Sequence, residues 1–188
     1  MRNLIAFASM LALAAPPQSQ DPLVRSAQRK LDEIRSGKPK PGAVYSFSVA
    51  ELNAWGRDAA KELVPEGIRD PRLTLGQGTA SVFMYIDFLK VRKGKKLETG
   101  WLLSRLLEGE RPLRVRATIT SSKGHATVHL TLVSISGIPI SGSSLDFLVD
   151  TFLRPLFPDA KINQPFELHD NVDHIEVLPA AARVLIKR

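Results

Sequence analysis

The four histidines are the side chains best suited to bind a metal ion or transfer protons near neutral pH, but none of them belongs to a site with recognisable ligand spacing. His125 and His129 share one face of an expected strand, but four residues of a strand span about 13 Å, which is too far for one metal ion. The segment HDNVDH at 169–174 lacks the ligand spacing of a tetrahedral site, and Asp and Asn are ordinary turn residues. We therefore expect a solvated turn at 169–174 and no metal.

Nucleophilic and phosphate-binding chemistry also lack a sequence signature. Ser141, in PISGSS, does not have the flanking glycines of a G-x-S-x-G elbow, and helix capping explains this run of serines. Neither G-x-x-x-x-G-K-[ST] nor G-x-G-x-x-G occurs in the chain. Pairs of carboxylates such as Asp146 and Asp150 are typical of a solvated helix surface. The sequence predicts a protein that is not an enzyme and uses no cofactor.

The most apolar stretch is an expected amphipathic helix at 143–157, preceded by a strand and the turn sequence SISGIPIS. Ser143 followed by Asp146 is typical of a helix start. Helical spacing places six apolar residues on one stripe: Leu145, Leu148, Val149, Phe152, Leu153 and Leu156. Two interpretations are open at this point: the stripe is ordinary core, or it lines a cavity that binds apolar chains.

The remaining elements are predicted from apolar periodicity. Helices are expected at 22–36, at 48–63 with a capping box formed by Ser48 and Glu51, and at 98–108. Strands are expected at 44–47, 73–75, 79–88, 113–120, 125–132, 166–168, 175–178 and 183–186. Several strands alternate between apolar and polar residues, as in an antiparallel sheet with one buried face.

The alternation assigns side chains to faces. In the strand that begins at His125, the expected inward residues are Ala126, Val128, Leu130 and Leu132. The predicted fold is α+β: a curved antiparallel sheet wrapped around one long amphipathic helix, with further helices at the N-terminal end. Residues 21–188 are expected to form a single domain.

The N-terminal sequence MRNLIAFASMLALAAPPQSQ has the layout of a secretory signal peptide. Arg2 precedes an apolar run that is too short to span a membrane, and Ala12-Leu13-Ala14 offers an A-x-A cleavage site. A buried first helix is the alternative interpretation. We expect residues 1–20 to direct export to the periplasm or cell envelope. The chain has no cysteine, so no disulfide stabilises it.

Positive charge is concentrated in one segment. The formal net charge is +7, and residues 90–123 hold ten Lys or Arg against three Asp or Glu. A cationic loop here leads into an apolar helix, which favours docking on an anionic membrane surface. The expected docking residues are Lys90, Arg92, Lys93, Lys95, Lys96 and Trp101. The alternative is a solvated loop before a packed helix. Nucleic acid is not expected as a partner, because Trp101 is the only aromatic residue near these charges.

Several features together resemble a known family. The exported N-terminus, the helix sequence SFSVAELNAW, the turn SISGIPIS and the amphipathic helix after it look like small bacterial envelope proteins of the LmeA type. Those proteins are similar to the tubular lipid-binding (TULIP) superfamily, in which a rolled sheet and a long helix enclose lipid tails. The resemblance implies a lipid or other apolar ligand between sheet and helix, bound without catalysis. The alternative function is a structural or adaptor envelope protein with a packed core and a basic docking face.

Overall fold

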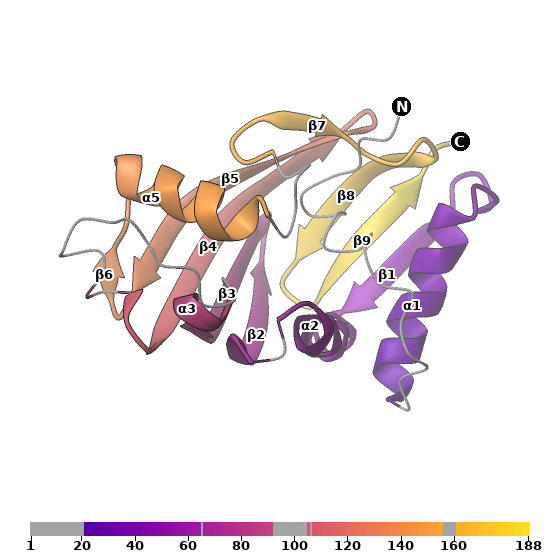
Figure 1. Ribbon diagram of the computed structural model, residues 1–188. Helices are drawn as coiled ribbons and strands as arrows, with labels where there is room; N and C mark the ends of the chain where they lie inside the picture. The colour runs from indigo at the N-terminus through magenta and orange to yellow at the C-terminus, as the bar shows by residue number, and fades with distance from the viewer. Residues whose placement is uncertain (1–20, 65, 92–104, 106, 156–160) are drawn as a thin grey trace.

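The computed structural model describes residues 21–64, 66–91, 105, 107–155 and 161–188, and it has an α+β architecture with two antiparallel sheets (Figure 1). The large sheet has the strand order β2-β3-β4-β5-β6, and β7 pairs with β5 beside this path. Its strands are β2 (Ile68–Gly76), β3 (Thr79–Asp87), β4 (Glu110–Ser122), β5 (His125–Ile135), β6 (Ile138–Pro139) and β7 (Pro165–Glu167). The small sheet has the order β1-β9-β8 and consists of β1 (Val44–Ser48), β8 (Val172–Leu178) and β9 (Ala181–Ile186).

Two helices near the N-terminal end begin at well-formed caps. Helix α1 (Pro22–Arg35) begins after Asp21, whose carboxylate accepts a hydrogen bond of 2.8 Å from the Leu23 N–H. Helix α2 (Val49–Leu63) begins at the predicted capping box of Ser48 and Glu51, in which each side chain accepts from the other residue's N–H. Such caps satisfy N–H groups that have no partner within the helix. Both predicted helices are confirmed.

The two sheets meet where β8 crosses the tips of two hairpins of the large sheet. The Gly78 N–H, in the β2–β3 turn, donates to the Val177 carbonyl at 2.9 Å, and the Gly124 N–H, in the β4–β5 turn, donates to the Asp173 carbonyl at 2.6 Å. Lys123 and Gly124 have φ of 49° and 76°, as a tight two-residue hairpin turn requires. β8 therefore attaches the small sheet across the ends of the large sheet's strands.

Apolar residues form two clusters on the inner face, which is the face of the large sheet that carries Ala117, Val133 and Ile135. The first cluster joins α1, the small sheet and the hairpin end of the large sheet. The second joins the opposite end of the large sheet to helices α3 (Phe88–Val91), α5 (Gly142–Leu148) and the π-helical turn η1 (Val149–Leu153). In Figure 1, α5 lies across β4 and β5, and α1 lies beside the small sheet.

A bulge in β5 changes the side-chain alternation predicted for this strand. Arg116 pairs with Leu132, whereas the next residue, Ala117, pairs with Leu130, so Thr131 is an extra residue. An extra residue exchanges the two faces beyond it. Ala126, Val128 and Leu130 face inward as predicted. The prediction for Leu132 is wrong: it lies on the other face, beside Arg116, and Val133 and Ile135 take the inner positions.

The predicted helix at 143–157 is not one continuous α-helix. The α-helical part, α5, ends at Leu148 and continues as the π-helical turn η1, and residues 156–160 lie outside the described part of the chain. Its N-cap is Ser141, not Ser143, and the Ser141 side chain forms no capping hydrogen bond. The longer helices are α1, with 14 residues, and α2, with 15. The predicted single sheet is likewise replaced by two sheets. Of the helix predicted at 98–108, only residues 105, 107 and 108 are described.

Two asparagines form hydrogen bonds with backbone groups at the edges of the large sheet, one on β2 and one on β5. The Asn53 amide of α2 accepts from the Leu73 N–H at 2.7 Å and donates to the Leu73 carbonyl at 2.8 Å. On β5, the Asn163 N–H donates to the Val128 carbonyl at 2.9 Å, and its side-chain oxygen accepts from the Leu130 N–H at 3.1 Å. Each asparagine supplies the pair of hydrogen bonds that a neighbouring strand residue would supply.

We expect Asn53→Leu to lower the free energy of unfolding by about 1–3 kcal/mol, because the Leu73 backbone groups then lose both partners while α2 still covers them. Urea denaturation followed by circular dichroism measures the change. Gln77→Leu, an apolar replacement in an exposed turn, serves as the control and should change stability by less than about 0.5 kcal/mol. Equal effects of the two substitutions would contradict this role of Asn53.

Candidate functional site

The predicted ligand-binding residues fall into two groups. Leu148 and Phe152 are buried in the second core cluster, and the Phe152 ring meets the Phe88 ring edge to face at 4.9 Å between centroids. Leu145 is half-buried and packs against the same cluster. Val149 and Leu153 are half-buried and are not among the residues packed against either cluster of the described chain. Leu156 lies outside the described residues.

The inner face of β3 carries two further apolar residues that, like Val149 and Leu153, are half-buried and outside both clusters. Val82 pairs with Leu73 and Val115, and Met84 pairs with Leu113, so both lie on the inner face. Ala80 on one side belongs to the first cluster, and Ile86 on the other side belongs to the second. Val82 and Met84 are half-buried, and neither is among the described residues packed against a cluster. We call Val82 and Met84 the inner strip.

The predicted membrane-docking residues are described only at Lys90. Lys90 is exposed on α3, and its N–H and that of Leu89 donate to the Asp87 carboxylate at 3.1 Å, which fixes the start of this short helix. Arg92, Lys93, Lys95, Lys96 and Trp101 lie outside the described residues. The structure thus places one member of the predicted set, at the end of β3.

A second concentration of positive charge lies on the outer face of the large sheet, opposite the inner strip. Cross-strand pairing places Arg72, Phe83 and Arg114 in one row, because directly paired residues share a face. The next row contains Ser81 and Arg116. The sequence alone placed the docking charges in the segment 90–101, and it did not predict that these residues from separate strands come together. We call Arg72, Phe83, Tyr85, Arg114 and Arg116 the outer arginine face.

Arg69 borders the outer arginine face and is already neutralised. Its Nε and Nη2 donate to the two oxygens of Glu110 at 3.0 and 2.7 Å, and its guanidinium lies 4.3 Å from the centre of the Tyr85 ring. The hydrogen bonds to Glu110 raise the pKa of Arg69 and lower the pKa of Glu110. The bidentate pair of Arg69 and Glu110 is therefore neutral and lies beside the outer arginine face.

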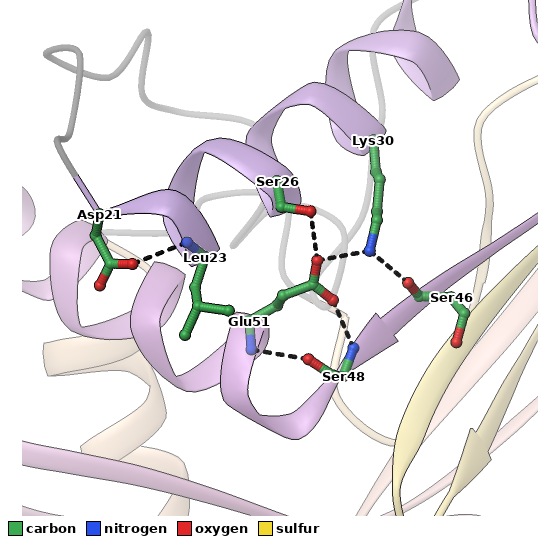
Figure 2. Close-up of polar contacts among 7 residues, drawn as sticks. All are labelled: Asp21, Leu23, Ser26, Lys30, Ser46, Ser48 and Glu51. Atoms are coloured by element: carbon green, nitrogen blue, oxygen red, sulfur yellow. Dashed lines mark hydrogen bonds and ion pairs between the residues drawn. The ribbon is translucent and has the colours of Figure 1, made fainter.

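The most strongly perturbed acid is Glu51, at the start of α2 (Figure 2). Its side chain accepts from Lys30 Nζ at 2.6 Å, from Ser26 Oγ at 2.6 Å and from the Ser48 N–H at 2.8 Å. Burial alone would raise the pKa of Glu51, but the hydrogen bonds from Lys30, Ser26 and Ser48 outweigh burial and lower it to about 2.

The Glu51 contacts connect three elements. Lys30 also donates to the Ser46 carbonyl at 2.7 Å, so one ammonium joins α1 to both α2 and β1. The Glu51 carboxylate accepts hydrogen bonds from all three donors. Because these bonds lower its pKa, the carboxylate stays ionised near neutral pH. Its chemistry is that of a structural ion pair.

The segment 169–174 forms a turn and the start of β8. His174 Nδ1 lies 2.6 Å from the Asp173 carboxylate, and its Nε2 lies 3.6 Å from Glu176. Within the described residues, no group of three or more His, Cys, Asp or Glu side chains has the arrangement of a metal site.

Comparisons with protein families, with characterised proteins and with solved structures found no significant match to this chain. Among the described residues, no helix has both the length and the apolar character required to cross a bilayer.

Proposed function

We propose that this chain is an exported envelope protein that binds a lipid or another apolar ligand against the inner face of the large sheet, without a catalytic step. In this proposal the large sheet and the α5–η1 segment enclose the ligand, as the resemblance to tubular lipid-binding proteins implies. Export rests on the signal-like sequence of residues 1–20. Cell fractionation of the tagged protein tests it.

The observation that supports the proposal is a set of apolar side chains that are only half-buried and are not packed against either core cluster. On β3, Val82 and Met84 lie between Ala80 of the first cluster and Ile86 of the second, and Leu153 on η1 is likewise half-buried and outside both clusters. A ligand that removed these groups from water would gain about 0.8 kcal/mol for each of its own methylene groups. Binding would therefore depend on hydrocarbon content more than on a headgroup.

The proposal is tested by mass spectrometry of organic extracts of the purified protein. We expect lipid in the wild-type extract. Met84→Gln should reduce the retained lipid roughly tenfold, because an amide facing hydrocarbon costs about 1–3 kcal/mol. Leu132→Gln is the matched control, since it places the same amide in a half-buried position on the opposite face.

A lipid-free wild-type extract, or equal retention by the two variants, would overturn the ligand proposal. It would favour the alternative function, a structural or adaptor protein with a packed core. The outer arginine face is the observation that supports that alternative, because it offers a basic docking surface whether or not a ligand is bound.

A further inference from the structure

The outer arginine face spans three consecutive strands at one side of the large sheet. Arg72 lies on β2, and Arg114 and Arg116 lie on β4. These two strands flank β3, which carries Phe83, and the three arginines occupy two adjacent rows. Strands lie about 4.8 Å apart and alternate residues of one strand about 7 Å apart, so the Cα atoms of these three arginines fall within a patch on the order of 10 Å across. All three are exposed.

These guanidinium groups carry charge that no described carboxylate neutralises. None of Arg72, Arg114 and Arg116 takes part in an ion pair with a described residue, in contrast to Arg69. Two of them are held in place by neutral partners. Arg116 Nε donates to Ser81 Oγ at 3.3 Å, and the Arg114 guanidinium lies 5.9 Å from the centre of the Phe83 ring. They are therefore positioned for an external anion.

The aromatic rings in this face do not form a platform for nucleic-acid bases. Phe83 and Tyr85 meet edge to face at 5.4 Å between centroids, with their planes at 81°. Arg69 lies over the Tyr85 ring and Arg114 over the Phe83 ring. Base stacking requires open ring faces, and it is the main source of affinity for single strands. Here the rings support guanidinium groups instead.

We infer that the outer arginine face docks the protein on an anionic phospholipid bilayer. A bilayer presents phosphates in two dimensions, which matches arginines spread over neighbouring strands, and guanidinium binds phosphate through two parallel hydrogen bonds. The docking surface lies on the opposite side of the sheet from the inner strip. It is thus independent of the proposed ligand site, and it differs from the segment 90–101 that the sequence suggested.

The experiment measures co-sedimentation of the protein with vesicles of phosphatidylcholine alone and of phosphatidylcholine mixed with phosphatidylglycerol. We expect binding to the mixed vesicles at low salt. The double variant Arg114→Gln/Arg116→Gln should weaken it roughly thirtyfold, because each cation near an anionic surface contributes about fivefold. Salt should weaken wild-type binding, since exposed charges are screened.

The matched control is Arg25→Gln/Arg29→Gln, which removes the same net charge from the exposed side of α1. It should bind mixed vesicles within about twofold of the wild type if location rather than total charge decides docking. Equal weakening by the two double variants would overturn the inference. So would wild-type protein that ignores mixed vesicles but binds a labelled single-stranded oligonucleotide. Thermal melting of each variant checks that it is folded, and Arg72→Gln takes the place of the test variant if Arg114→Gln/Arg116→Gln fails to fold.

Discussion

We expect Phe152→Ala to lower the free energy of unfolding by about 3–5 kcal/mol, as large-to-small changes of a buried aromatic residue do. Phe152 is 8% exposed and contacts two other rings, Phe88 at 4.9 Å and Phe147 at 6.5 Å between centroids. Its removal would leave a cavity between η1 and the end of the large sheet. Equilibrium unfolding in urea, read by circular dichroism, measures the loss.

Leu153→Ala is the matched control for this substitution. Leu153 follows Phe152 in the same π-helical turn but is only half-buried and does not belong to the cluster. Its replacement should cost about 1 kcal/mol or less in stability while reducing lipid retention, if the proposed ligand contacts it. A loss below about 1 kcal/mol for Phe152→Ala would contradict the assignment of this ring to the core.

Glu51 should make the protein's stability depend on pH in the acid range. The folded-state pKa of about 2 lies below the ordinary value of 4.5, so the contribution is fully present above about pH 5. It is lost as the pH falls from there towards about 2. The full contribution is on the order of 3 kcal/mol, because Glu51 is only 7% exposed and solvent does not screen it strongly. Urea unfolding at a series of pH values measures it.

Glu51→Gln tests the source of this pH dependence. The variant should be less stable than the wild type by on the order of 3 kcal/mol near neutral pH, and the difference should shrink as the pH falls. Glu62→Gln, an exposed change on the same helix, should leave both stability and its pH profile unchanged. A constant difference between wild type and Glu51→Gln at every pH would show that the effect comes from side-chain shape and not from charge.

Local sequence patterns predicted the contacts between residues that are close together in the sequence. The capping box of Ser48 and Glu51 spans three residues and was correctly placed. Ser26 and Lys30 complete the same carboxylate's environment from 25 and 21 residues away. Their contribution depends on how α1 packs against α2, and no short-range pattern encodes that packing.

Single-residue irregularities account for the main differences in the candidate site. Alternation assigned Leu132 to the inner face, but the extra residue at Thr131 reverses the pattern for the rest of the strand. The apolar stripe predicted on one long helix is interrupted in the same way by the π-helical turn. The outer arginine face was missed for a different reason: its members come from strands whose register the sequence does not specify.

The asparagine contacts on β2 and β5 have a consequence for the protein in a crowded compartment. An unpaired strand backbone can recruit a strand from another molecule and begin intermolecular polymerisation. Asn53 and Asn163 occupy backbone groups on both sides of the large sheet, at Leu73 and at Val128–Leu130. These two side chains therefore act as terminators of strand addition. Because α2 still covers the Leu73 edge when Asn53 is replaced, loss of Asn163 should be the change that first becomes visible as oligomers, which grow with protein concentration at temperatures where the monomer is still folded.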